Sequence, residues 1–357
     1  MEKDRKNYIA HCLVVPYPAQ GHINPMLQFS KRLMQRGVKV TLVTVVSNWK
    51  TMSIKNFTSI HVESISDGYD DGGLAAAESL ETYINTFWRV GSQTLALLVQ
   101  KLAESNHPAD CVIYDALLPW ALDVAKKFGL LGAAFFTQSC TTNNIYFQAY
   151  KKLLELPLAH TQYLLPGLPK LAAGDLPSFL NKYGSYPAFF DIAVNQFANI
   201  DKADWVLANT FYELEQGVVD WLVKIWPLKA IGPSLPSMYL DRRLKDDKDY
   251  GVNMYNPNSE ACIKWLDDKP KGSVVYVSFG SMAGIIKAVA DEKEIVRRET
   301  ITHCIKELLE TEKGNEIKKN SIKWKNLAKS YVDEGGNSDK NTKEFVDELA
   351  QCCAALN

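Results

Sequence analysis

Two residues could form a proton-transfer pair, although they lie far apart in the sequence. His22 follows an apolar run that ends at Val15, and it comes just ahead of a helix that Asn24 can cap and Pro25 can open. The positive end of the helix dipole disfavours an imidazolium, so we expect a neutral ring that accepts a proton near neutral pH. A loop histidine that only hydrogen-bonds the backbone fits the spacing equally well.

Asp115 is the candidate partner of His22. It ends the apolar run CVIYD, and in a parallel sheet the carboxyl ends of the strands lie along one edge. An aspartate beside a histidine fixes the tautomer of the ring and stabilises the imidazolium formed by proton abstraction. Asp115 could equally stabilise the turn before Pro119, and the spacing leaves both roles open.

Other residues near the same strand ends could line a ligand pocket. Thr137 closes the run GAAFFT and Gln138 follows it, so both are candidates for polar contacts with a bound acceptor. Aromatic side chains could hold a small aromatic or terpenoid ligand, and core packing is the other interpretation of them. The candidates among them are Phe87, Phe147 and Phe189.

Several enzyme classes lack their motif in this chain. No GxSxG elbow is present, which argues against acyl-enzyme chemistry. The loop AQGHINP is not GxGxxG, so a dinucleotide-dependent dehydrogenase is a distant alternative. The turn FGSM, which contains Gly280 and Ser281, could present backbone amides and a hydroxyl to a phosphate, although a plain loop has the same pattern.

The apolar runs alternate with helical patterns, which is typical of a doubly wound α/β fold. The runs are IAHCLVV, VKVTLVTVV, CVIYD, GAAFFT and WVLAN, and the helical patterns cover residues 25–36, 82–101, 119–128 and 139–155. A chain of 357 residues is long enough for two domains of about 100–200 residues each. The charged segment 236–258, interrupted by Pro and Gly, predicts an exposed linker after an N-terminal domain, residues 1–235.

The second domain is expected to be incomplete. SVVYVSF, residues 273–279, has the pattern of a strand buried on both faces. Only residues 280–284 separate it from IIKAV, whereas a parallel crossover needs about 10–12 residues. Mostly charged helical patterns follow. We therefore predict a shortened second domain over residues 259–338 and a final helix over residues 339–357 that packs back on the first domain.

Composition excludes several classes of protein. Apolar residues make up 46% of the chain and charged residues 23%, and 40 basic residues balance 41 acidic ones, so we expect no nucleic-acid partner. No apolar run approaches the ~18 residues of a membrane span, and the N-terminus lacks the long apolar core of a signal peptide. The seven cysteines show neither CxxC pairs nor metal-ligand spacing. We predict a cytosolic monomer without a metal site.

Four motifs, in order, closely resemble plant UDP-dependent glycosyltransferases of small molecules. They are HCLVVPYPAQGHINPMLQFSKRL, CVIYDALLPWALDVAKKFG, WLDDKPKGSVVYVSFGSMA and EGGNSDKNTKEFVDEL. The resemblance spans nearly the whole chain, and it is greatest to the group that glucosylates phenolic acids, thiohydroximates and terpenoids.

The resemblance implies a GT-B architecture, in which two Rossmann-like domains bind the acceptor and the UDP-sugar. It implies that His22 is the general base, Asp115 is its partner, and transfer from UDP-glucose proceeds with inversion and without a cofactor or metal. Acceptor contacts would come from Phe87, Thr137, Gln138, Phe147 and Phe189, and donor contacts from Gly21, Gly280 and Ser281.

The chain departs from the family pattern after SFGSMA. The family continues to a box that begins Trp-x-Pro-Gln and passes through His-Cys-Gly-Trp-Asn-Ser, and none of this occurs here. IIKAVADEKEIVRRETI resembles the segment beyond the box, which indicates a deletion on the order of 100 residues. We therefore expect weak or lost UDP-sugar binding. A noncatalytic product that binds an aglycone or an intact paralogue is the alternative, and a gene-model error is a third explanation.

Overall fold

The computed structural model describes residues 8–51, 60–244, 247, 250–252, 258–276 and 298–355. The chain divides into two compact units. Unit 1 comprises residues 1–254 and 330–357, and unit 2 comprises residues 255–329. All the candidate residues before residue 240 therefore belong to unit 1.

Unit 1 is built around a parallel sheet of seven strands, counted over the described residues. The strands are β1 (His11–Val15), β2 (Lys39–Val45), β3 (His61–Ile65), β4 (Cys111–Asp115), β5 (Leu131–Phe136), β8 (Trp205–Ala208) and β9 (Leu228–Ala230). Their spatial order is β3-β2-β1-β4-β5-β8-β9. β2 and β3 lie in succession on one side of β1, and β4 lies on the other side of β1. The order reverses between β1 and β4, where open α/β sheets bind their ligands.

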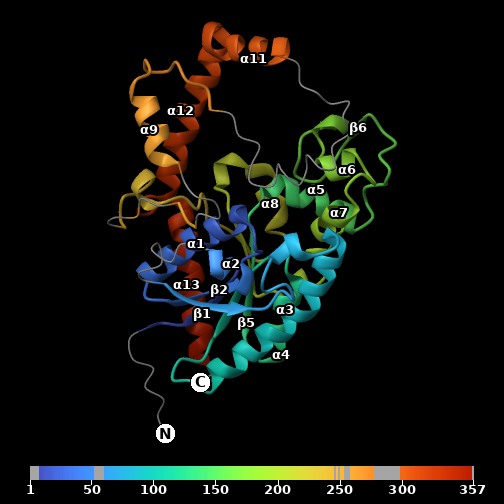
Figure 1. The fold of residues 1–357 in the computed structure, drawn as a ribbon, viewed down its shortest axis with the longest axis vertical. Helices are drawn as coiled ribbons and strands as arrows, with labels where there is room; N and C mark the ends of the chain where they lie inside the picture. The colour runs from blue at the N-terminus through green and yellow to red at the C-terminus, as the bar shows by residue number, and fades with distance from the viewer. Residues whose placement is uncertain are drawn as a thin grey trace. The chain divides into compact units, whose positions relative to one another are not determined.

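Helices lie on both sides of this sheet (Figure 1). The helices within unit 1 are α1 (Gln20–Gln35), α2 (Val46–Thr51), α3 (Leu80–Ala103), α4 (Pro119–Lys127), α5 (Cys140–Tyr150), α6 (Ser178–Asn181), α7 (Pro187–Asn195), α8 (Gln216–Leu222) and α13 (Asn337–Ala355). A small antiparallel pair, β6 (Gln162–Tyr163) and β7 (Leu171–Ala172), precedes α6. None of the helices described is long and apolar enough to cross a membrane.

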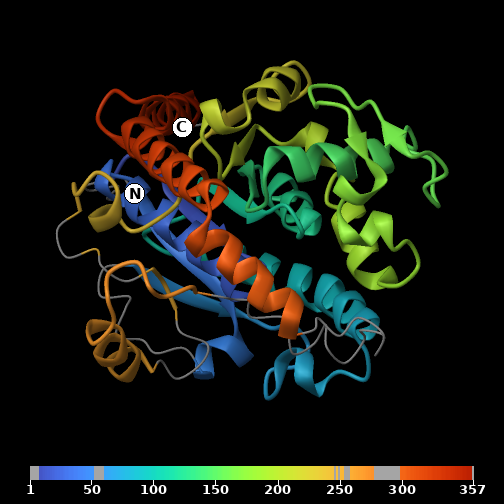
Figure 2. The ribbon, with the colours of Figure 1, turned by 90° about the horizontal axis from the view of Figure 1, so that it is seen from above.

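The sheet has a hydrophobic core on each face, because successive side chains of a strand point to opposite faces. Leu13 and Val15 of β1 belong to the core that also contains residues of α3, α4 and α5. Cys12 and Val14 belong to the core on the other face, with residues of α1 and α13. Figure 2 shows α13 (red) beside α1 (blue).

Unit 2 contains α9 (Ser259–Asp267), α11 (Arg298–Glu310) and most of α12 (Glu312–Val332). The strand predicted for SVVYVSF is not observed over residues 273–276, which have no regular structure, and residues 277–279 lie outside the described residues. A strand needs a neighbour to hydrogen-bond, and the described part of unit 2 contains no other strand.

The predicted linker also differs from the structure. Up to Val252, several of its described residues are buried and contact α1, although Met238, Tyr239 and Tyr250 are exposed as predicted. Asp247 pairs with Lys31 at 2.5 Å, and the Val252 amide donates to Oδ1 of Asn24 at 3.0 Å. Of the charges that suggested an exposed linker, those of Asp241 and Asp247 are thus paired with Arg32 and Lys31 of α1. The division of the chain into the predicted domains otherwise stays a prediction.

Candidate active site

The candidate site lies where the strand order reverses. β1 and β4 are neighbours, and their register pairs Val15 with Tyr114, so Asp115 ends β4 one residue beyond the end of β1. The loop after β1 leads directly into α1, which carries His22. The sheet therefore brings together two side chains that are separated by 93 positions in the sequence.

His22 sits within the first turn of α1, not in a loop ahead of it. The carbonyl of Ala19 accepts the amides of His22 and Ile23, both at 2.9 Å, so the helix begins earlier than predicted. Asn24 does not cap the helix, because its side chain binds the Val252 amide. Pro25 lies inside the helix. His22 still lies at the positive end of the helix dipole.

A short hydrogen bond joins the pair. Nδ1 of His22 lies 2.6 Å from Oδ2 of Asp115, whose other oxygen accepts the Leu117 amide at 3.0 Å. Asp115 thus contacts both the His22 ring and the turn before Pro119, and its role as the partner of a general base stays a prediction. Because the carboxylate is only 1% exposed and accepts at Nδ1, the proton of a neutral His22 ring lies on Nδ1. Nε2 is then left as a proton acceptor.

Two further residues flank the His22 ring. The hydroxyl of Thr137, at the end of β5, lies 3.1 Å from Nδ1 of His22. The ring of Tyr17 lies 5.4 Å from the imidazole, between centroids. Burial and the charge of Asp115 raise the pKa of Tyr17 to about 12, so this phenol stays protonated near neutral pH. Thr137 was predicted from the sequence, whereas Tyr17, which lies in the loop just before α1, was not.

A narrow hollow opens beside the pair. It is lined by His22, Asp115, Ala116, Leu117, Phe135, Thr137, Gln138, Asn143 and Gln196. Two of its polar residues, Asn143 and Gln196, were not predicted, because they lie inside helical patterns or next to one rather than at strand ends. Thr137 and Gln138 are the predicted acceptor contacts that the structure places beside His22.

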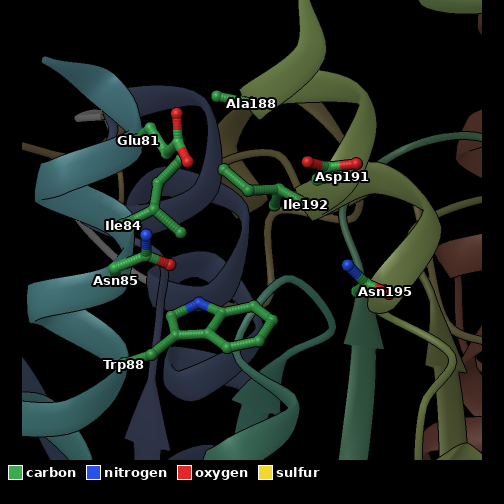
Figure 3. A pocket seen from close by; sticks show the side chains of 8 residues that line it. All are labelled: Glu81, Ile84, Asn85, Trp88, Ala188, Asp191, Ile192 and Asn195. Atoms are coloured by element: carbon green, nitrogen blue, oxygen red, sulfur yellow. The ribbon is translucent and has the colours of Figure 1, made fainter.

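A larger cavity lies between α3 and α7 (Figure 3). Its volume is about 150 Å³, and its lining residues are Glu81, Ile84, Asn85, Trp88, Ala188, Asp191, Ile192 and Asn195. The lining thus combines two carboxylates, two amides and an indole ring with the apolar side chains of Ile84, Ala188 and Ile192. Asn195 of this cavity directly precedes Gln196 of the hollow in the chain, so the two spaces lie close together.

The predicted aromatic contacts are mostly core residues. Phe87 is 1% exposed and packs edge-on against Trp120 at 5.5 Å. Phe147 is also buried and packs against Trp226 at 4.7 Å. The structure does not bring either ring to the hollow, because both rings fill the space under the helices. Phe189 is half-buried and stacks on Phe179 at 5.5 Å.

Of the predicted donor contacts, Gly21 alone lies within the described residues. Gly21 is exposed in the first turn of α1, and a Cβ atom at this position would meet nothing within 4 Å. Packing alone therefore does not require a glycine there. Gly280 and Ser281 lie outside the described residues. The three donor contacts stay predictions.

Comparison with known proteins identifies the family. The glycosyltransferase N-terminal domain profile matches residues 9–66. UDP-glycosyltransferase 74F2 of Arabidopsis thaliana is 34% identical over 447 aligned positions, covering 95% of this chain and 98% of the relative. Flavonol 7-O-beta-glucosyltransferase UGT74F1 of the same plant is 33% identical, covering 98% and 99%. Mogroside I-E synthase of Siraitia grosvenorii is 32% identical, covering 96% and 98%.

Solved structures agree with these relatives. The structure of Os79 from O. sativa in complex with UDP matches with a TM-score of 0.83 and 27% identity, over 95% of this chain and 100% of that chain. Os79 has also been solved with U2F and a trichothecene, and that structure matches with a TM-score of 0.82. The predicted GT-B-type α/β fold is thereby confirmed. Since relatives above 30% identity match along almost their whole length, the chain belongs to the plant UDP-glycosyltransferase family.

Proposed function

We propose that His22 is the general base of an inverting sugar transfer and that Asp115 orients it. The acceptor oxygen attacks the anomeric carbon of UDP-glucose as its proton moves to Nε2 of His22. The glycosidic bond forms while the bond between that carbon and the diphosphate oxygen breaks, and UDP leaves. The observation that carries this proposal is the 2.6 Å contact at Nδ1, which leaves Nε2 free to accept the proton.

The acceptor is proposed to be a small plant metabolite with a phenolic, carboxylic or terpenoid group. The names of the relatives support this class, because they include a flavonol glucosyltransferase and mogroside I-E synthase. The trichothecene held by Os79 supports it as well. In this chain, the hollow beside His22 would receive the reacting group, and the cavity between α3 and α7 would receive the more distant part of the acceptor.

Donor binding is proposed to be much weaker than in an intact relative. The alignment with UDP-glycosyltransferase 74F2 extends over 447 positions, whereas this chain has 357 residues, so a block of the relative has no counterpart here. We propose that the donor box, absent from the sequence, is the part of the relative that lacks a counterpart. Groups that stabilise charge on the leaving diphosphate usually supply a large share of catalysis. We therefore expect transfer to be slow at best.

A noncatalytic chain that binds only an aglycone is the second candidate function. The same missing block favours it, since unit 1 keeps the His22 pair and both cavities. A cytosolic location is also proposed. It is supported by the seven cysteines, which all lie within described residues and are not joined in disulfides, as suits a reducing compartment.

One experiment separates these functions. The purified chain and its His22→Ala variant are incubated with saturating UDP-glucose and a panel of phenolic and terpenoid acceptors, and products are measured by mass spectrometry. Slow glucoside formation that disappears in the variant supports the transferase. Acceptor binding without any product supports the noncatalytic candidate. Saturable micromolar binding of UDP-glucose in calorimetry would contradict the proposed loss of donor affinity.

A further inference from the structure

Two amide oxygens beside His22 are buried without a hydrogen-bond partner. They are Oδ1 of Asn143 and Oε1 of Gln138, and neither has a partner among the residues that the structure describes. Both residues line the hollow that also contains His22 and Asp115. Asn143 is only 1% exposed, so bulk water does not reach its side chain. Buried polar atoms are normally satisfied, and these exceptions need an explanation.

The orientation of the Asn143 amide is fixed by its other end. Its Nδ2 donates to the backbone carbonyl of Gln138 at 3.2 Å, which leaves Oδ1 as the unpaired atom. The neighbouring residue Asn144 shows the usual arrangement. Its Nδ2 donates to the Pro166 carbonyl at 2.7 Å, and its Oδ1 accepts from Gln148 at 2.9 Å. The chain thus satisfies one buried amide on α5 fully and leaves the adjacent one half satisfied.

In this conformation the hollow is too narrow to hold a water molecule, so no water pairs with these oxygens while Gln138 stays in place. A group that reaches them must enter with a ligand. The half-buried side chain of Gln138 follows the end of β5 and is the part of the lining that can turn aside. The entering group must be a hydrogen-bond donor, because both unpaired atoms are acceptors.

We propose that Asn143 recognises a second hydroxyl of the acceptor, next to the hydroxyl that His22 deprotonates. This inference rests on the proposed function, and it narrows the acceptor to compounds with vicinal hydroxyls, of which catechols are the aromatic class. Oδ1 of Asn143 accepts the hydrogen bond of the second hydroxyl once the side chain of Gln138 has turned aside. A ligand without the second hydroxyl leaves Oδ1 of Asn143 buried and unpaired, so it binds more weakly than a ligand that has this donor.

The test measures binding and therefore does not depend on sugar transfer. Methyl caffeate carries two vicinal hydroxyls, and methyl ferulate is the same molecule with one of them capped by a methyl group. Methyl coumarate lacks the second oxygen and controls for the size of that methyl group. Dissociation constants are measured by calorimetry or ligand-observed NMR for the wild type and for Asn143→Leu.

We expect the wild type to bind methyl caffeate at least ~10-fold more tightly than methyl ferulate or methyl coumarate. In Asn143→Leu, the affinity for methyl caffeate falls to that of methyl coumarate, whereas the affinity for methyl coumarate is unchanged or higher. Asn143→Ser keeps an acceptor oxygen and should keep part of the preference. It also serves as the second variant if the leucine variant does not fold. Asn106→Leu, at an exposed amide that lines neither cavity, should leave the preference unchanged.

The outcomes separate this inference from the proposed function. If the wild type binds all three esters equally, Asn143 does not recognise the second hydroxyl, although the proposed acceptor site still stands. A preference that survives in Asn143→Leu also overturns the recognition by Asn143. No binding of any ester overturns both the inference and the acceptor site.

Discussion

The two histidines at opposite ends of β1 show how the surroundings of a ring decide what it can do. Nδ1 of His11 donates to the carbonyl of His107 at 3.0 Å, and its Nε2 lies 2.8 Å from the Thr41 hydroxyl. Both nitrogens are used by fixed neighbours. His22 uses only Nδ1 in this way, and its side chain is 18% exposed. Proton transfer is therefore expected of His22 and not of His11.

His11 should make the stability of unit 1 depend on pH. Burial, followed by the charge of Lys39, lowers the pKa of His11 from 6.5 to about 4. Between these values the unfolded chain binds a proton that the folded chain does not, so falling pH favours unfolding. The free energy of unfolding should fall by about 3 kcal/mol across this window because of His11 alone. Chemical denaturation at a series of pH values measures this change.

The control for this prediction is His11→Gln, which is neutral at every pH. The variant should be less stable near neutral pH but should lose less stability between pH 6.5 and about 4. An unchanged slope in the variant would show that His11 does not carry the effect.

The Asp115 carboxylate should set the tautomer of His22. In Asp115→Asn, the amide oxygen replaces the atom that accepts from the Leu117 amide, so the new NH₂ group faces Nδ1 of His22. Nδ1 must then accept, and the ring proton moves to Nε2. We expect ¹⁵N NMR to show the Nδ1–H form in the wild type and the Nε2–H form in the variant. The exposed His61 ring should not change, and a His22 ring that keeps its tautomer would contradict the proposed role.

At this scale the sequence predicted that His22 and Asp115 lie together, but it did not predict every neighbour of the pair. His22 and Asp115 were found because the carboxyl ends of parallel strands share an edge. Asn143 was missed, because its burial and its unpaired oxygen depend on how α5 packs over the hollow. Phe87 and Phe147 were misjudged as acceptor contacts for the same reason, since aromatic spacing does not distinguish a core ring from a pocket ring.

At the scale of elements, an ion network fastens α13 and the segment before unit 2 to α1. Asp241 pairs with Arg32 at 3.1 Å and with Arg243 at 2.7 Å, and Arg243 also pairs with Asp339 near the start of α13 at 2.8 Å. Burial opposes ionisation of Asp241, but the Ser237 hydroxyl and the two guanidinium groups outweigh burial, so the pKa of Asp241 lies below its usual value. The network therefore needs the ionised carboxylate.

Removing that charge should destabilise unit 1. Asp241→Asn leaves the buried guanidinium of Arg32 without its counter-ion, and breaking a buried ion pair of this kind costs about 3 kcal/mol. Urea unfolding followed by circular dichroism measures the loss. The matched control is Asp347→Asn, an exposed aspartate on α13, which should change the free energy of unfolding by less than about 0.5 kcal/mol. Equal effects of the two substitutions would contradict the role of the network.

The strands of the seven-stranded sheet that sequence patterns missed lie at its edges. β3 and β9 are the outermost strands, and they carry polar residues such as Glu63 and Lys229 because one side of an edge strand meets solvent. The inner strands have continuous apolar runs and were all predicted. The missed linker packing has a different cause, because ion pairs with α1 depend on a distant part of the chain.

At the scale of the whole molecule, the buried apolar side chains are concentrated in one unit. Both hydrophobic cores belong to unit 1, and no hydrophobic side chain described in unit 2 is buried. In α9, Ile263 is 57% exposed and Trp265 is 53% exposed. Burial of apolar surface is the main favourable contribution to folding. Unit 1 therefore buries enough apolar surface to fold by itself. The described part of unit 2 buries little apolar surface that could stabilise it.

This difference should appear in amide hydrogen exchange of the full chain. Peptides from α9 and α11 should exchange at least ~10³-fold faster than peptides from β1, β4 and β5, because helices without buried contacts open without unfolding the core. Mass spectrometry of digested peptides measures both sets in one sample, and α3, which packs into the core, is the helical control. Adding UDP should leave exchange in α9 and α11 unchanged if donor binding is as weak as proposed. Protection of α9 to the level of α3 would show that unit 2 has a core of its own, and the proposed loss of donor affinity would lose its structural support.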